Sequence, residues 1–264
     1  MPVVAGSLDV EVLRAALLTS DSPWQDLEHH ATISSTNARA AMVGEPWRVV
    51  VADHQSEGRG RLARSWEAPP GTSVAVSATV PLPPDGAGWL PLLAGLSVAE
   101  AITAATGLAA ELKWPNDVLL PDDADRKVCG VLCEVVTGLG AAFVVVGAGV
   151  NVDQTREQLP VDTATSLALA GAEEVDRNRL VAAYLRGLAG WYAALTGPDP
   201  AAPRAAYRRR CTTVGRPVTV TRPDRPDVVG TAVAVDDDGR LVVDSADGRH
   251  AWAAGDVTHV RSAG

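Results

Sequence analysis

Apolar residues recur along this chain with two different spacings, and the spacing changes near residue 211. Helical periodicity predicts helices over these ranges: 9–18, 89–106, 176–195 and 203–210. Apolar, β-branched runs bounded by turn residues predict strands over these ranges: 48–52, 73–80, 128–136 and 142–150. Beyond residue 211 the runs become short and closely spaced, and they predict these strands: 217–221, 228–235, 241–244, 249–253 and 257–261.

The two spacings divide the chain into two parts. The mixture of helices and strands predicts a large α/β body, which we assign to residues 1–212. Five strands within about fifty residues predict a small β-barrel appended to that body, which we assign to residues 213–264. A length of 264 residues allows both domains to bury a core.

The composition is that of an ordinary soluble globular protein, with 47% apolar and 21% charged residues. No apolar run reaches the roughly eighteen residues of a membrane span, and residues 1–6 do not resemble a secretory signal. The three cysteines have neither an even count nor metal-type spacing. We therefore expect a cytoplasmic protein with reduced thiols and no membrane partner.

Positive charge is distributed unevenly. The net charge of −9 disfavours nucleic acid unless cations are concentrated locally. Arg59, Arg61 and Arg64 lie within six residues of one another, which suits a small anionic ligand better than a long polyanion. Only two basic residues are lysines, Lys113 and Lys127, and both fall within one stretch of fifteen residues.

The segment from Gln55 to Trp66 follows a predicted strand, as ligand-binding loops often do. Its glycines permit close backbone approach to a ligand, and its arginines offer paired donors to phosphate or carboxylate. A mobile, solvated loop is an equally good interpretation of this segment taken alone. Its spacing matches neither a P-loop nor a dinucleotide-binding motif.

Three further segments allow a structural and a functional interpretation. Ile33–Asn37 is either a helix cap or a set of contacts to a neutral polar ligand. Lys113–Asp117 is a turn whose lysine and tryptophan a bare turn does not need, and Lys127 opens the next strand. Gly147–Asn151 ends a strand with either a turn or a close approach to ligand.

No arrangement typical of covalent or metal catalysis is present in the sequence. The five histidines lack metal-ligand spacing, so we identify no protein ligand to a metal. Cys129 and Cys133 lie an even number of residues apart in an apolar strand, so we expect both in the core. The predicted chemistry is charge stabilisation without a covalent enzyme intermediate.

Taken in order, these segments resemble the biotin protein ligases, from about residue 30 to the C-terminus. The resemblance rests on these segments: Ser35-Thr-Asn37, Gln55…Gly-Arg-Gly-Arg61…Trp66, Lys113-Trp-Pro-Asn-Asp117, Lys127-x-x-Gly130 and Gly149-Val-Asn151. It implies an α+β fold, with a mixed sheet and helices like class II aminoacyl-tRNA synthetases, plus an SH3-like C-terminal barrel. Some members carry an N-terminal DNA-binding domain, for which this chain has no room, so a ligase without repressor activity is expected.

The resemblance also implies a two-step reaction. Biotin and MgATP give biotinyl-5′-AMP and pyrophosphate, and the biotinyl group then passes to one lysine of a biotin carboxyl carrier domain of an acetyl- or acyl-CoA carboxylase. ATP with Mg²⁺ is the implied co-substrate and biotin the substrate. No DNA partner is expected, and a homodimer is possible.

The family's site residues carry over onto matching positions here. Those implied for biotin are Ser35, Thr36, Asn37, Gln55, Arg59, Arg61 and Lys127. Those implied for ATP and the adenylate are Arg59, Arg61, Arg64, Trp66, Lys113, Asn116 and Asn151. Lys127 and Arg61 would stabilise charge during catalysis, while Asp117 would orient the substrate lysine. Tyr207 matches an adenosine-side aromatic loosely, and Ala63 stands where the family often has glycine.

Three rival interpretations remain. A lipoate or octanoate ligase of the same superfamily would bind a flexible apolar acid, for which the Ser-Thr-Asn segment with Gln55 is very polar. A biotin-responsive transcription repressor would need a helix-turn-helix and a basic reading face. A nucleic-acid-binding module built on Arg59–Arg64 conflicts with the net charge of −9.

Overall fold

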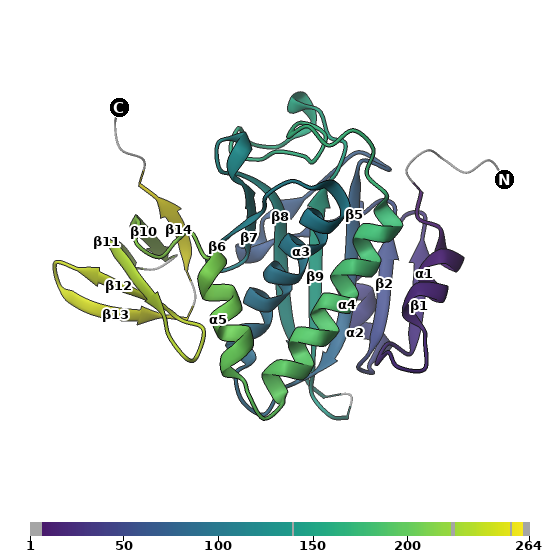
Figure 1. Ribbon diagram of the computed structural model, residues 1–264, viewed down its shortest axis with the longest axis horizontal. Coiled ribbons are helices and arrows are strands. Elements are labelled where there is room, and N and C mark those ends of the chain that lie inside the picture. The colour runs from purple at the N-terminus through teal and green to yellow at the C-terminus, as the bar shows by residue number, and fades with distance from the viewer. Residues whose placement is uncertain (1–6, 139, 223–224, 254, 261–264) are drawn as a thin grey trace.

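The computed structural model describes residues 7–138, 140–222, 225–253 and 255–260 (Figure 1). Its larger part is built on a seven-stranded sheet with this order: β1 (Asp26–His30), β2 (Arg48–Ala52), β5 (Ser73–Pro81), β9 (Phe143–Asn151), β8 (Arg126–Val136), β7 (Asp117–Leu120) and β6 (Glu111–Lys113). β1 and β2 pair in parallel, and all other neighbours pair antiparallel. The body is therefore an α+β domain on a mixed sheet, as expected.

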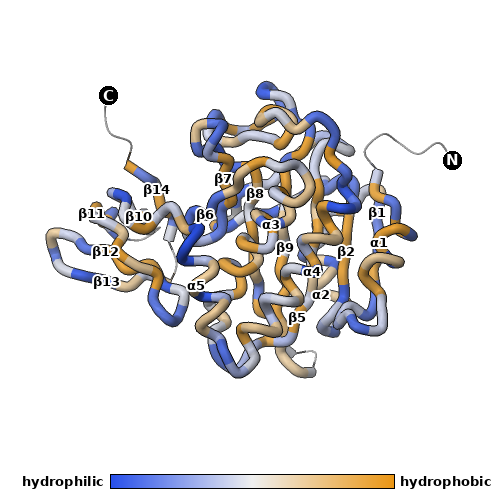
Figure 2. Tube along the Cα trace, in the orientation of Figure 1, coloured by the Kyte–Doolittle hydropathy of each residue, from blue (hydrophilic) through white to orange (hydrophobic). Residues whose placement is uncertain are grey.

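Helices cover both faces of this sheet. α3 (Leu90–Thr106) and α4 (Arg177–Thr196) lie side by side across one face, flanked by α1 (Val10–Leu17) and α5 (Ala201–Arg210) (Figure 1). The main core lies under these helices, and Figure 2 shows apolar colours along the central strands. α2 (Thr36–Val43) covers the opposite face, over a second apolar cluster.

The long helix α3 is deeply buried because its surface is apolar almost all round. The segment Ala87–Thr106 is long and apolar enough to cross a membrane, but 67% of its apolar 18-residue window is buried inside the protein. Its few polar groups are paired: Ser97 donates to the carbonyl of Leu93, and Glu100 accepts from the indole of Trp191. α3 is therefore a core helix packed on α4.

The C-terminal strands form their own antiparallel sheet beside α5 and β6 (Figure 1). Its order is β13 (Gly248–Trp252), β12 (Leu241–Ser245), β11 (Arg225–Val235), β10 (Pro217–Arg222) and β14 (Asp256–His259). All five predicted tail strands are present with slightly shifted ends, and the expected end at residue 261 lies outside the described residues.

Two tryptophans of the body hold the turn between β11 and β12. The Trp114 indole donates to the carbonyl of Gly239 at 3.0 Å, and the Trp89 indole donates to that of Asp237 at 2.8 Å. The hydroxyl of Thr213 accepts from the backbone N–H of Trp114 at 3.0 Å. A bare turn would not need a tryptophan at position 114. The structure shows that Trp114 attaches the C-terminal sheet to the body.

Several short elements escaped the sequence prediction. β1 reads Asp-Leu-Glu-His-His, so it lacks the apolar alternation that marks a strand. A two-residue hairpin, β3 (Gly58–Arg59) with β4 (Ser65–Trp66), lies inside the Gly/Arg segment. Single 3₁₀ turns occur at η1 (Arg61–Ala63), η2 (Ala87–Trp89), η3 (Pro121–Asp123) and η4 (Arg156–Gln158).

Candidate functional site

One group of predicted site residues lies at the N-terminus of α2. Ser35 caps the helix by accepting a hydrogen bond from the N–H of Ala38 at 3.3 Å, so the cap interpretation is correct. Gln55 Oε1 accepts from the backbone N–H and the hydroxyl of Thr36, at 2.8 and 2.9 Å. Because Oε1 is used in this way, Nε2 is the end that lies beside Gly58 and can donate to a ligand.

Asn37 lies deeper, with 7% of its surface exposed. Its Nδ2 donates to Glu134 at 2.7 Å, and its Oδ1 accepts from Ser77 at 2.6 Å. A Cβ at Gly147 would lie 2.0 Å from Asn37 Oδ1, so the bare backbone of β9 provides the room. These contacts fix α2 against β8 and β9, and they leave little of Asn37 to face a ligand.

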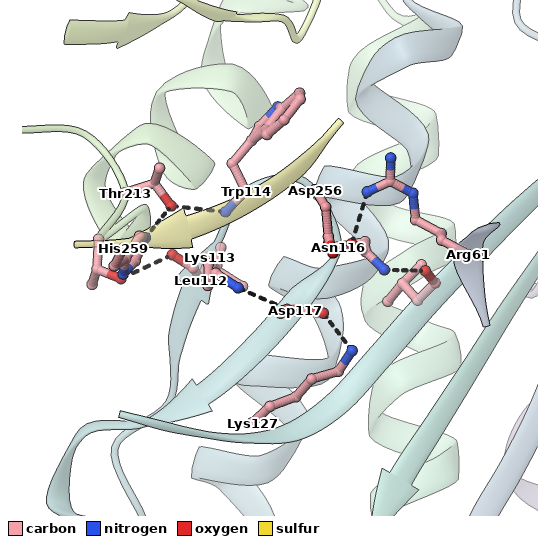
Figure 3. Close-up of polar contacts among 12 residues, drawn as sticks. Arg61, Leu112, Lys113, Trp114, Asn116, Asp117, Lys127, Thr213, Asp256 and His259 are labelled. Carbon is pink, nitrogen blue, oxygen red and sulfur yellow. Dashed lines mark hydrogen bonds and ion pairs between the residues drawn. The ribbon is translucent and has the colours of Figure 1, made fainter. Parts of the chain in front are cut away.

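The Gly/Arg loop (residues 58–66) connects these residues to the other end of the site. Arg61 donates to Asn116 Oδ1 at 3.1 Å (Figure 3), and it also donates to the carbonyl of Gly255 at 3.2 Å. Arg64 forms an ion pair with Asp256. The loop thus contacts both the Lys113–Asp117 turn and the C-terminal sheet.

The Gly/Arg loop also borders an open cavity. It lines a cavity of about 610 Å³ together with Leu132 and Glu134 of β8. Leu62, one residue before Ala63, adopts the left-handed conformation with φ 55°. Such a conformation is uncommon for a residue with a side chain and marks a sharp bend at the loop tip.

Trp66, at the end of the loop, lies flat on β8 and β9. A Cβ at Gly149 would come within 2.6 Å of its ring, and one at Gly130 would lie 3.4 Å from it. Lys127 Nζ lies 5.7 Å from the ring centroid, within cation–π range. Gly149, in a segment where a close approach to ligand was one interpretation, therefore makes room for the Trp66 side chain, beside which Lys127 lies.

Asp117 joins the two lysines of the chain. Its Oδ1 lies 2.6 Å from Lys127 Nζ, and its Oδ2 lies 3.3 Å from Lys113 Nζ (Figure 3). Its carboxylate is 16% exposed, at the entrance of β7 where the sequence placed it. Burial alone raises the pKa of Asp117, but Lys127 and Lys113 outweigh it and hold that pKa below its ordinary value.

Not every predicted residue presents free polar groups to this site. Both ends of the Asn151 amide are used internally, by Gln154 at 2.9 Å and by the carbonyl of Thr165 at 2.8 Å. Both ends of Asn116 are also used, by Arg61 and by the carbonyl of Val131. These two asparagines are therefore placed to position backbone and arginine rather than to contact a ligand directly.

Tyr207 and Cys129 lie in the core, as does Cys211, whereas Cys133, also expected there, is only partly buried against it. Tyr207 is 1% exposed and meets Trp89 edge-on at 5.8 Å, so it does not line an open adenosine site. Burial raises the pKa values of both Cys129 and Cys133 to about 12. Neither thiol is therefore ionised near neutrality.

The structure adds residues that sequence reasoning missed. Ser77, Glu134 and Asp256 contact predicted site residues from strands far away in sequence. Glu134 lies two residues after Leu132 on β8, so the two share a face of the strand, and both line the cavity beside the loop. Arg59 belongs to the same loop and is exposed.

Comparisons with known proteins agree on one family. The model of the biotin/lipoate A/B protein ligase family matches residues 32–151, and that of the biotin protein ligase C terminal domain matches residues 213–260. The chain is 38% identical over 265 residues to the biotin–[acetyl-CoA-carboxylase] ligase of Mycobacterium tuberculosis, covering 96% of each protein.

Two further relatives extend this likeness. The chain is 33% identical over 186 residues to the bifunctional ligase/repressor BirA of Bacillus spizizenii, covering 67% of this chain and 56% of that protein. Among solved structures, the biotin protein ligase of Aquifex aeolicus in complex with biotin and ATP matches with a TM-score of 0.76 and 25% identity. That match covers 90% of this chain and all of the Aquifex chain.

Proposed function

Because this chain belongs to the biotin protein ligase family, we propose that the α2 N-terminus, the Gly/Arg loop and the Asp117 cluster together form its active site. The enzyme activates biotin with ATP to biotinyl-5′-AMP and transfers the biotinyl group to a lysine of a carboxylase carrier. The relatives establish this reaction, whereas the assignment of its steps to residues is the proposal.

Biotin occupies the region between α2 and the loop. Gln55 Nε2 and the Ser35 hydroxyl hydrogen-bond its neutral ureido ring, where a charged group would gain nothing. Thr36, whose hydroxyl donates to Gln55 and accepts from Ser77, orients Gln55 for this contact. Asn37 does not contact biotin directly; its hydrogen bond to Glu134 supports the part of the site that holds the ureido ring. The biotin carboxylate points towards Arg59, Arg61 and Lys127, because fixed positive charge must offset its repulsion from the phosphates of ATP.

ATP binds as its Mg²⁺ complex on the other side of the same cations. Arg64 and Lys113 lie on this side, and Trp66 offers an aromatic surface beside Lys127. Asn116 holds Arg61 in place through the 3.1 Å hydrogen bond. Asn151 keeps the end of β9 in position through Thr165.

We assign Lys127 to the first step of the reaction, adenylate formation, and Asp117 to the second, transfer to the carrier lysine. Lys127 pairs with Asp117 before substrates bind and turns towards the acyl phosphate when that group forms. The released Asp117 carboxylate, which still pairs with Lys113, then accepts a hydrogen bond from the incoming carrier lysine and orients it. The 2.6 Å contact between Lys127 and Asp117 is the observation that carries this assignment.

The catalytic domain comprises residues 1–212, and residues 213–264 form the SH3-like module of the family. The carrier belongs to an acetyl- or acyl-CoA carboxylase. The net charge of −9 disfavours DNA as a partner. The proposed ligase is cytoplasmic and is a monomer or a homodimer.

The decisive experiment offers several acids to the enzyme. The protein is incubated with MgATP, an apo carrier domain and either biotin, lipoate or octanoate, and the carrier is analysed by mass spectrometry. Biotin should be attached to one lysine, and a carrier whose acceptor lysine is replaced by arginine should stay unmodified. Transfer of lipoate or octanoate in place of biotin, or no transfer, would contradict the proposal.

A further inference from the structure

The C-terminal sheet holds the tip of the Gly/Arg loop at two points. Arg64 pairs with Asp256, the first residue of β14, although 192 residues separate them in the chain. Arg61 donates to the carbonyl of Gly255 at 3.2 Å, and Figure 3 shows Asp256 beside Arg61 at the end of that strand. The loop is therefore fixed to a second domain as well as to the body.

The Gly/Arg loop makes few internal contacts that would hold it in one conformation. Its hairpin consists of two residue pairs, and its tip residue Leu62 is 53% exposed in a left-handed conformation. Segments with few buried contacts open at low free-energy cost. Contacts from outside the loop should therefore set how much of the time it stays closed.

The C-terminal sheet is itself attached firmly enough to serve as a support. The Trp114 and Trp89 indoles bind the turn at one end of the sheet. Thr213 joins Trp114 to His259 on β14, with 3.0 Å contacts on each side. Asp256 lies three residues from His259 on the same strand, so the body fixes its position.

We propose that Asp256 is a positioning residue of the ligase, which holds the Gly/Arg loop over biotinyl-5′-AMP through Arg64. The identity of the intermediate rests on the proposed function. Asp256 does not touch the reacting atoms; it limits how often the loop opens. When the intermediate escapes, water attacks the acyl carbon, the bond to the phosphate oxygen breaks, and biotin and AMP are released.

The first test uses the ligand-free protein and does not depend on its activity. The loop carries trypsin sites after Arg59, Arg61 and Arg64, so the rate of cleavage there reports loop opening. Asp256→Asn should speed this cleavage about two- to fivefold, the range expected for loss of one partly exposed ion pair. Asp256→Glu should restore most of the protection.

Asp244→Asn is the matched control for Asp256→Asn. Asp244 also pairs with an arginine of the C-terminal sheet, Arg249 at 3.1 Å, but that pair does not contact the loop. Its removal should leave cleavage within the loop unchanged. Equal cleavage rates in Asp256→Asn and wild type would overturn the proposal, and so would equal acceleration by Asp244→Asn.

The second test measures the intermediate. Without a carrier, Asp256→Asn should release AMP from biotin and MgATP about two- to fivefold faster than wild type, because the adenylate escapes more often. Asp256→Glu should return towards wild type. A lower KM for MgATP with unchanged AMP release would overturn the proposal, since Asp256 would then compete with phosphate for Arg64. If wild type forms no adenylate, the proposed function fails while the cleavage result still decides the loop contact.

Discussion

At the scale of single residues, one carboxylate balances both lysines of the chain. Asp117→Asn removes this charge and leaves the Lys113 and Lys127 ammonium groups facing each other. We expect the free energy of unfolding to fall by about 2 kcal/mol, less than the roughly 3–5 kcal/mol for a fully buried pair, because the side chains are partly exposed. Transfer to the carrier should fall much more steeply. Urea unfolding and a single-turnover transfer assay measure the two effects.

Asp123→Asn separates these two effects. Asp123 is 18% exposed and lies between Arg126, at 2.6 Å, and Arg156, at 3.6 Å, outside the proposed site. Its loss should cost a similar amount of stability and leave transfer unchanged. Comparable loss of transfer in both variants would mean that Asp117 acts only by stabilising the fold.

Lys127 should matter most in the first step. Lys127→Ala removes the cation nearest to the proposed acyl phosphate, so adenylate formation should slow by about 10²–10³. Pyrophosphate release with biotin and MgATP, without a carrier, measures this step. Arg126→Ala, which removes a neighbouring cation on β8 that pairs with Asp123, should leave the rate near wild type. A normal rate in Lys127→Ala would show that the phosphates bind elsewhere.

Candidate site residues could be predicted from the sequence where they stand together in a short motif. Residues such as Asp117 and Gln55 stand in motifs, and Trp66 connects their surroundings, because it pairs with Gly58 beside Gln55 and lies next to Lys127. The partners Ser77, Glu134 and Asp256 could not be predicted, because each belongs to a strand whose neighbours are set by sheet pairing and domain contact. Asn151 shows the converse, since its motif did not reveal that Gln154 and Thr165 already use its amide.

At the scale of elements, the glycines of β9 shape the surface on which the loop rests. Gly149→Ala would place a Cβ 2.6 Å from the Trp66 ring, which must then move. Overpacking of about 1–3 kcal/mol should displace the ring and raise the KM for MgATP roughly tenfold or more. Steady-state kinetics with varied MgATP, beside a thermal unfolding curve, would show whether binding changes while the fold remains.

Gly190→Ala is the control for the added methyl group. A Cβ at Gly190 of α4 would meet nothing within 4 Å, and alanine is the better helix former. Its kinetics should match wild type, with equal or greater stability. An unchanged KM in Gly149→Ala would mean that Trp66 does not contact the nucleotide.

Most of the longer helices and strands could be predicted from the sequence. Asp176 caps α4 as predicted by accepting from the N–H of Arg179, and α3 is buried because it is apolar all round. The missed strand β1 contains four polar residues out of five and is a strand because β2 pairs with it. Pairing of this kind is tertiary information, which local periodicity does not carry.

At the scale of the whole molecule, the junction between body and C-terminal sheet is sensitive to acid. His259 lies there, with its ring 3.0 Å from the hydroxyl of Thr213 and near Lys113 and Arg216. Burial, together with these two cations, lowers the pKa of His259 from 6.5 to about 4. Above pH 6.5 the imidazole is neutral in both folded and unfolded chains, so it contributes no pH dependence there.

Between pH 6.5 and pH 4 the unfolded chain binds a proton at this histidine and the folded chain does not, so stability falls as the pH falls. Partial exposure limits the loss to about 1–2 kcal/mol. The carboxylates with lowered pKa values, such as Asp117 and Asp236, lose their contribution only at lower pH.

His259→Gln keeps a polar group beside Thr213 but cannot take up a proton. Its free energy of unfolding should therefore decline less than that of wild type when urea titrations are repeated from pH 7 to pH 4.5. Loosening of the junction should also release Asp256, so the ratio of the trypsin cleavage rates in the Gly/Arg loop of wild type and His259→Gln, compared at the same pH, should rise as the pH falls. Parallel pH profiles for the two proteins would show that His259 is not the group that makes this junction sensitive to acid.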